Sequence, residues 1–212
     1  MSRPTFTPSV IAYLGLLLAV GVGRLLEMRL SRRHQRALSA RGFAREREPA
    51  FALMVAVHTG LLLGAGVEVL VAPRPVPGGL AVAALVAFGL ANALRWWVIA
   101  TMAEQWNVQV VNALGLGVVT TGPFRWIRHP NYVAVFVELL ALPLVHAAYV
   151  TAVLGTLAHV GILARRIGLE ERVLLGDATY RATMGGKPRF FPLGRAPSPS
   201  RSASPSRDRT GV

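Results

Sequence analysis

Thr120-Thr-Gly-Pro-Phe-Arg-Trp-Ile-Arg-His-Pro-Asn-Tyr132 is a polar stretch that directly precedes a long apolar run. It holds two arginines, one histidine, three aromatic residues and two prolines. The chain then stays apolar from Asn131 to about Ala164, and as one helix this run would be about 50 Å long, against about 30 Å for the hydrocarbon core of a membrane. The run must therefore be broken. Pro143 and the weakly apolar His146-Ala-Ala-Tyr149 predict a helical hairpin of two short transmembrane helices.

The composition indicates an integral membrane protein. Of the 212 residues, 53% are hydrophobic and only 16% are charged, which is atypical of a soluble globule. The net charge of +13 comes almost entirely from arginine, with Lys187 the only lysine, and the arginines stand beside the ends of apolar segments. This placement follows the positive-inside rule and does not favour a nucleic-acid partner. The absence of cysteine excludes disulfides, thiolate metal sites and cysteine nucleophiles, and we expect no metal site.

Three further apolar segments, at about residues 10–30, 50–72 and 80–101, are long enough to span a membrane. With the hairpin they predict an all-α integral membrane protein of about five transmembrane helices. Seven arginines lie in the segment 29–49, which should therefore be a cytoplasmic loop. The N-terminus is then outside and the C-terminus cytoplasmic.

Two polar clusters each allow a structural and a functional interpretation. Arg128 and His129, at the start of the helix that Pro130 opens, either anchor the chain at the headgroups or form an anion site with the helix N-terminus. Arg166 and Glu170 are four residues apart on a helix, and on spacing alone a surface ion pair is favoured.

Ionisable residues inside apolar spans are candidates for function because their burial in hydrocarbon is costly. The alternative is structural pairing within the bundle, which we favour for Glu68 and weigh equally for Arg95 and Glu138. His58 is a further candidate, whereas His146 and His159 are expected to be hydrogen-bonded packing residues. Arg24 and Glu27, near the end of the first span, are expected to reach the headgroups.

Three motifs together resemble the isoprenylcysteine carboxyl methyltransferase family. They are Arg128-His-Pro-Asn-Tyr132, the Arg166-x3-Glu-Glu171 segment, and Tyr180 followed by Arg189-Phe-Phe-Pro192. The resemblance covers roughly residues 10–193 and is greatest to a bacterial branch that includes alkylpyrone and polyketide O-methyltransferase-like members. It implies an integral membrane methyltransferase whose cofactor, S-adenosyl-L-methionine, is enclosed by the cytoplasmic C-terminal part.

The resemblance also implies a set of site residues. The cofactor pocket would contain Gln109, Leu116, Gly117, Val118, Val119, Phe124, Arg128, His129, Pro130, Tyr132, Arg166 and Glu170. Phe124 stands where family members often have tyrosine, so a hydroxyl contact is lost there. Arg166 and Glu170 are also the catalytic candidates, and the depth and polarity of Arg95 and Glu138 suggest that they orient the oxygen of the acceptor.

Within that pocket several residues suit the parts of the cofactor. Its carboxylate would suit Arg128, His129 or Arg166, and its amino group would suit Glu170. Its adenine would suit an apolar or aromatic wall such as Phe124, Trp126 or Tyr132.

The resemblance divides the chain into three parts. Residues 1–101 form three N-terminal transmembrane helices, and residues 102–193 form a catalytic region of cytoplasmic loop, helical hairpin and cofactor-enclosing C-terminal segment. Residues 194–212 are rich in Arg, Ser and Pro and are expected to be a disordered basic tail.

The favoured function is an O-methyltransferase acting on a lipophilic small-molecule acceptor that enters from the bilayer. The acceptor would carry a carboxylate, as in an isoprenylcysteine, or an acidic enol or phenol, as in an alkylpyrone. One alternative is a phospholipid- or quinone-type methyltransferase of the same fold. Another is a non-catalytic transporter or assembly protein, although no internal repeat supports a transporter.

Overall fold

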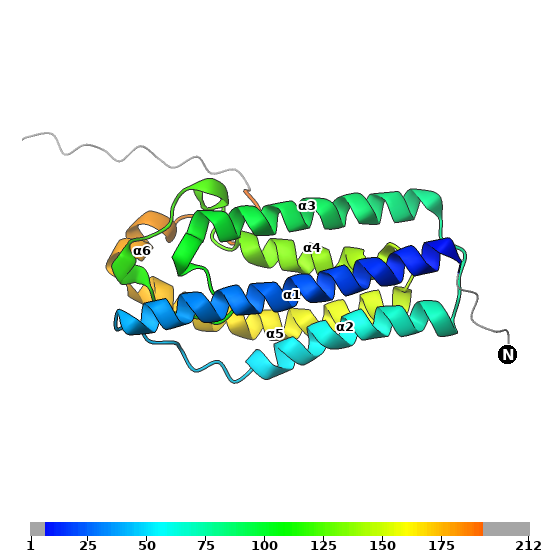
Figure 1. Ribbon diagram of the computed structural model, residues 1–212. Coiled ribbons are helices and arrows are strands. Elements are labelled where there is room, and N and C mark those ends of the chain that lie inside the picture. The colour runs from blue at the N-terminus through cyan, green and yellow to red at the C-terminus, as the bar shows by residue number, and fades with distance from the viewer. Residues whose placement is uncertain (1–6, 193–212) are drawn as a thin grey trace, which may run out of the picture.

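The computed structural model describes residues 7–192 and consists of long helices lying side by side (Figure 1). The predicted disordered tail, 194–212, lies outside the described residues. The long helices are α1 (Pro8–Ala40), α2 (Phe51–Val71), α3 (Gly78–Met102), α4 (Pro130–Leu144) and α5 (Tyr149–Gly176), followed by the short α6 (Ala178–Met184). Three single-turn 3-10 helices lie between α3 and α4: η1 (Ala103–Gln105), η2 (Leu114–Leu116) and η3 (Gly122–Arg125).

The helices have the length and surface of membrane spans. Among the described residues, four helical segments are long and apolar enough to cross a membrane, and α4 is a shorter apolar helix of 15 residues. Leu18, Leu63 and Leu90 are at least 66% exposed on the outer faces of α1, α2 and α3. Such outward-facing leucines are expected where the solvent is lipid.

Two helix ends differ from the sequence prediction. We expected the first helix to end near Leu30, but α1 continues to Ala40, and Gly42 follows with a φ of +85°. We also expected a short helix to end near Ala164, but α5 runs without a break to Gly176. The charged residues beyond each apolar segment favour helix as much as the apolar ones do, so the change in polarity does not end the helix.

At the end of the bundle farthest from α6, a buried glutamate caps the start of a helix. The chain reverses at residues 145–148, between α4 and α5, near the predicted break. Glu68 accepts hydrogen bonds from the backbone N–H groups of Val150 (3.1 Å) and Thr151 (2.8 Å) at the start of α5, and it pairs with Arg74. Glu68 thus has the structural role that we favoured.

The opposite end of the bundle gathers the loops. There α6, the 3-10 helices and the connection after α1 lie around the ends of α1, α3 and α5 (Figure 1). The connection from α1 to α2 pairs with the loop before η2, since Glu46 N–H donates to the Val110 carbonyl at 3.0 Å and Arg45 bridges to Val111. Segments far apart in sequence therefore meet at this end.

Candidate functional site

The motif Thr120–Tyr132 is held in place on both sides. Gly122 has a φ of +55°, and a Cβ there would lie 2.5 Å from Thr101 Oγ1 on α3, so glycine is required. At its other end, the backbone N–H groups of Arg128 and His129 donate to the carbonyls of Pro188 (2.9 Å) and Arg189 (3.0 Å). The segment Pro188–Arg189, which we call the strap, is therefore hydrogen-bonded to the residues that precede α4.

Glu171 ties this strap to α5. It accepts hydrogen bonds from His129 Nε2 (3.1 Å) and Arg189 Nε (3.0 Å), and Arg128 lies 3.3 Å away. The Glu171 carboxylate raises the pKa of the Arg189 guanidinium. The two groups expected to form an anion site, Arg128 and His129, thus face a carboxylate of the protein itself.

Arg166 is the centre of a second buried network. Its Nε donates to the Tyr132 hydroxyl at 3.0 Å, its Nη1 lies 3.1 Å from Glu48, and its Nη2 donates to the Val108 carbonyl. The Tyr132 hydroxyl in turn donates to Glu170. The prediction of a surface ion pair between Arg166 and Glu170 is wrong, because Arg166 is buried, pairs with Glu48 and donates a hydrogen bond to Tyr132.

These networks surround a cavity of about 130 Å³, which we call the polar cavity. All the cofactor residues expected from the resemblance line it except Leu116, which lies outside its wall. Tyr180 of α6 also lines it, and burial together with the Glu170 carboxylate raises the Tyr180 pKa to about 12, so its hydroxyl stays protonated at neutral pH. The structure therefore brings residues from four separate segments, around 109–119, 124–132, 166–170 and 180, to one place.

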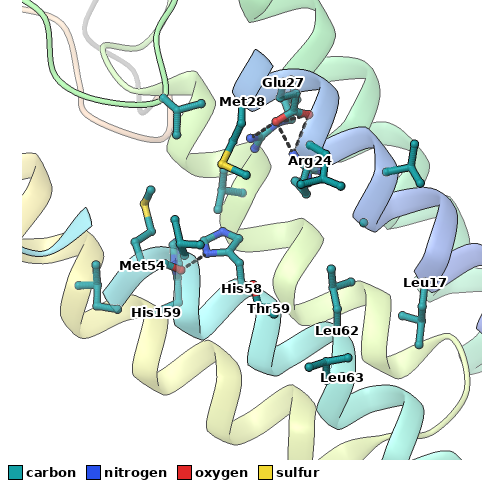
Figure 2. Close-up of a pocket in the computed structure, with 18 of the residues that line it drawn as sticks. Leu17, Arg24, Glu27, Met28, Met54, His58, Thr59, Leu62, Leu63 and His159 are labelled. Carbon is teal, nitrogen blue, oxygen red and sulfur yellow. Dashed lines mark hydrogen bonds and ion pairs between the residues drawn. The ribbon is translucent and has the colours of Figure 1, made fainter. Parts of the chain in front are cut away.

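A larger cavity of about 640 Å³, which we call the apolar cavity, lies between α1, α2 and α5. Figure 2 shows its wall, with Met28 and Met54 toward one end and Leu17, Leu62 and Leu63 toward the other. Leu18 and Leu63 line it and are also at least 66% exposed on the outer surface. The apolar cavity therefore opens sideways, toward the surface that faces lipid.

The two cavities share a wall. Trp106, Asn131, Tyr132 and Arg166 line both of them. Trp106 Nε1 and Asn131 Oδ1 are buried and have no hydrogen-bond partner among the described residues. Buried polar atoms are rarely left unpaired in native proteins, so this wall is a place where a ligand is expected to bind.

A cluster of four charged residues lies at the apolar cavity, and all of them except Glu138 line its wall. Arg95 binds Glu27 through Nε and Nη2 (2.6–3.1 Å) and contacts Glu138 through Nη1 at 3.3 Å. Arg24 also contacts both carboxylates, at 2.8 and 3.1 Å. The expectation that Arg24 and Glu27 reach the headgroups is therefore wrong, because these two positive and two negative groups neutralise each other inside the bundle. Arg95 lines the apolar cavity and Glu138 does not.

The histidines in the spans also differ from the prediction. His159 is 2% exposed, and neither of its ring nitrogens has a partner among the described residues. His146 Nε2 is likewise without one, although its ring lies against Tyr13. Both were expected to be hydrogen-bonded packing residues. His58 Nδ1 lies 2.8 Å from the Met54 carbonyl.

Sequence reasoning missed Glu48, Trp106 and Asn131. Glu48 lies among seven arginines whose charge suggested only a topological role. Trp106 lies in a loop without a periodic pattern. Asn131 could have been found, because it occupies the open position within Arg128-His-Pro-Asn-Tyr132.

Comparison with known proteins agrees with this geometry. Residues 82–176 match the sequence model of the isoprenylcysteine carboxyl methyltransferase (ICMT) family. The chain is 29% identical over 154 residues to YpbQ, an uncharacterized protein of Bacillus subtilis (strain 168), covering 72% of this chain and 90% of YpbQ.

The fold is also similar to that of the eukaryotic intramembrane Ras methyltransferase ICMT, with a TM-score of 0.59 and 22% identity. That match covers 84% of this chain and 65% of the eukaryotic chain, so this chain spans less than two thirds of the length of that enzyme. The matched family segment contains the motif, the shared wall and both Arg166 and Glu170. Residues 82–176 are therefore similar in sequence to the isoprenylcysteine carboxyl methyltransferase family, and the fold of the chain is similar to that of the eukaryotic Ras methyltransferase ICMT.

Proposed function

We propose that this protein is an S-adenosyl-L-methionine-dependent membrane O-methyltransferase whose cofactor binds in the polar cavity and whose lipophilic acceptor binds in the apolar cavity. The single observation that carries the proposal is the shared wall of Trp106, Asn131, Tyr132 and Arg166. Methyl transfer requires two ligands to meet in line with water excluded. Two adjoining cavities, one polar and one apolar, meet that requirement.

The residues of the polar cavity fit the chemistry of the cofactor. Glu170 and the Tyr180 hydroxyl suit its amino and carboxylate groups, and Arg128 Nε is buried without a partner among the described residues. Phe124 and Val118 offer an apolar surface to the adenine. When bound, the cofactor supplies an electrophilic methyl group on a sulfonium.

The volume of the polar cavity bears on how the cofactor enters. Pockets for ligands of this size usually hold about 300 Å³ or more, against about 130 Å³ here. We infer that the loop 107–119, which forms one wall, moves outward when the cofactor binds. Binding should then slow amide hydrogen exchange in that loop.

The acceptor would enter from the bilayer through the side opening between α1 and α2. Its oxygen would be methylated at the shared wall, and the unpaired Trp106 N–H and Asn131 amide oxygen are placed to hold it. Arg95, on the wall of the apolar cavity, would orient the acceptor, and Glu138 would act by positioning Arg95. Acceptors with a carboxylate or an acidic enol or phenol fit this arrangement.

The orientation that we propose for the protein in the membrane is based on the distribution of its arginines. The segment 29–49, with seven arginines, lies at the same end of the bundle as the polar cavity. This end would be cytoplasmic, with the N-terminus outside, in a bacterial inner membrane. Soluble S-adenosyl-L-methionine would then reach the polar cavity directly.

The first test is binding of S-adenosyl-L-methionine to the detergent-purified full chain by calorimetry. Wild type should bind saturably, and Glu170→Ala and His129→Ala should lose binding. Glu104→Ala is the matched control, because Glu104 forms a surface pair with Arg41 away from both cavities. A folded wild-type protein without saturable binding would favour the non-catalytic transporter or assembly protein.

The acceptor class is tested separately with methyl-labelled cofactor and membrane extracts. Label in an acidic enol, phenol or carboxylate lipid would support the proposal. Label in phospholipid amines or quinone precursors would keep the cofactor site but replace the acceptor by the alternative class.

A further inference from the structure

Two histidines meet on the wall of the apolar cavity, away from the shared wall. His58 comes from α2 and His159 from α5, and their ring centroids are 5.0 Å apart with the planes at 87° (Figure 2). Both residues line the apolar cavity. They add two imidazoles to a wall that is mainly aliphatic away from its charged residues and the shared wall.

The hydrogen-bonding state of the pair leaves capacity for a ligand. His58 Nδ1 lies 2.8 Å from the Met54 carbonyl, so this nitrogen carries the proton and donates it, and Nε2 keeps a free lone pair. His159 is 2% exposed, and both of its ring nitrogens lack a partner among the described residues. A neutral His159 therefore offers one donor and one acceptor that nothing in the described chain uses.

The charges around the cavity decide what kind of group fits. Each arginine on this wall already faces a carboxylate: Arg24 and Arg95 face Glu27 and Glu138, and Arg166 faces Glu48. A carboxylate bound at the histidine pair would therefore have no unpaired cation beside it. A neutral hydroxyl, which both donates and accepts, matches what the two imidazoles leave open.

The position of the pair separates it from the site of methylation. His159 and Arg166 are seven residues apart on α5, so their Cα atoms are two helical turns, or about 10 Å, apart along the helix axis. Arg166 belongs to the wall shared by the two cavities. A group bound by the histidines is therefore a second polar group of the acceptor, distinct from the methylated oxygen.

We propose that His58 and His159 bind a neutral hydroxyl of the acceptor about 10 Å from the oxygen that is methylated, and so select acceptors that are polar at two points. The distance between the two groups rests on the proposed function, which assigns methylation to the shared wall. The binding of a hydroxyl at the histidine pair is independent of the proposed function.

The experiment uses three long-chain alkylphenols of equal length. One has a plain chain, one carries a hydroxyl about 10 Å from the phenol oxygen, and one carries a carboxylate at that point. Their dissociation constants are measured on the detergent-solubilised full chain, and binding of S-adenosyl-L-methionine is measured on the same samples. Comparing ratios between variants cancels the unequal partitioning of the probes into micelles.

Wild type should bind the hydroxylated phenol more tightly than the plain one, by about fivefold relative to the same ratio in His159→Phe, as expected for one net hydrogen bond. The carboxylate probe should bind more weakly than either. His58→Phe should also lose the preference, and it serves if His159→Phe fails to fold. His146→Phe is the matched control, because it removes a partly buried histidine outside the apolar cavity whose Nε2 also lacks a partner among the described residues, and it should keep the preference.

Equal ratios in wild type and in both histidine-pair variants would overturn the proposal, because the imidazoles would then hold only water. Loss of the preference in His146→Phe as well would overturn it too, since the effect would not be local. A hydroxyl preference that depends on His159, in protein that does not bind S-adenosyl-L-methionine, would support the hydroxyl site while refuting the proposed function.

Discussion

The polar and the apolar cavity lie side by side but are built in opposite ways. The polar cavity is small and is lined mainly by loops and by Glu170. The strap at Pro188–Arg189 and Glu171 lie outside its wall and hold Arg128 and His129, which line it. The apolar cavity is about five times larger, lies between three long helices and opens toward lipid. This contrast suits the proposed ligands, because a soluble cofactor would enter from water and a lipophilic acceptor from the bilayer.

The two cavities also differ in how their charged side chains are paired. Around the polar cavity, Arg166, Tyr132 and Glu170 form a chain of hydrogen bonds that reaches the cavity surface. At the apolar cavity, two arginines and two glutamates pair with each other, and away from the shared wall the histidine pair keeps hydrogen-bonding capacity. Buried charges are tolerated only when paired, so the second arrangement keeps the acceptor's surroundings neutral.

The largest expected effect is at the wall that both cavities share. Arg166→Ala leaves Glu48 buried without its partner and removes hydrogen bonds to Tyr132 and the Val108 carbonyl. We expect affinity for S-adenosyl-L-methionine and turnover to fall by about a hundredfold or more. Arg165→Ala, one residue away and exposed, should change neither quantity. Calorimetry and a methyl-transfer assay measure the two quantities.

A smaller effect should separate the neighbouring carboxylates Glu170 and Glu171. Glu171→Gln weakens the ion pairs to Arg128, His129 and Arg189 and should lower the free energy of unfolding by about 3 kcal/mol. Glu170→Gln should leave the unfolding temperature nearly unchanged but weaken cofactor binding by about tenfold. Thermal unfolding followed by tryptophan fluorescence, together with calorimetry, distinguishes them. The reverse pattern would mean that Glu171 contacts the cofactor.

Much of the polar cavity could be predicted because its residues lie in short motifs. Arg128-His-Pro-Asn-Tyr132 and the pair at Arg166 and Glu170 keep fixed spacings, and a shared side of the membrane brings them together. The apolar cavity has no such motif, because many different arrangements of leucine and valine can form a hydrophobic wall between helices. His58 and His159 are about a hundred residues apart, and no spacing rule relates them.

For the fold, the helices could be predicted from the local sequence, whereas the contacts between helices could not. The lengths of the apolar runs predicted α2 and α3 to within two residues, and the excess length of 131–164 predicted a break where residues 145–148 turn. The pairing of Arg24 and Glu27 with Arg95 could not be predicted, because it depends on how α1 packs relative to α3. Polarity along a single helix does not determine which neighbour it meets.

Filling the apolar cavity should separate the two ligands. Val55→Trp places a large side chain on its wall, and we expect the KM for the acceptor to rise on the order of tenfold, with cofactor binding unchanged. Leu53→Trp is the matched control, because Leu53 lies on the same helix but is 51% exposed and outside the wall. Loss of cofactor affinity in Val55→Trp would contradict the assignment of separate cavities.

The smallest effect tests the role of Glu138 behind the apolar cavity. Glu138 does not line the cavity, and its Oε2 contacts Arg95 Nη1 at 3.3 Å, whereas Glu27 holds the same guanidinium through Nε and Nη2. Glu138→Gln should therefore tilt Arg95 rather than release it. We expect kcat to fall by about threefold, the size expected when one shared hydrogen bond weakens, with the KM for the acceptor and cofactor affinity unchanged.

Glu138→Asp, which keeps the charge, should restore part of the lost rate if Glu138 acts through Arg95. If Glu138 had only a structural role, Glu138→Gln would instead lower the unfolding temperature, and the kcat of the folded fraction would be unchanged. Arg95→Ala removes the group on the cavity wall itself and should lower turnover further. If folded Arg95→Ala and Glu138→Gln both kept full turnover, orientation of the acceptor would have to come from Trp106 and Asn131 at the shared wall, and the charge cluster would serve only to join α1, α3 and α4.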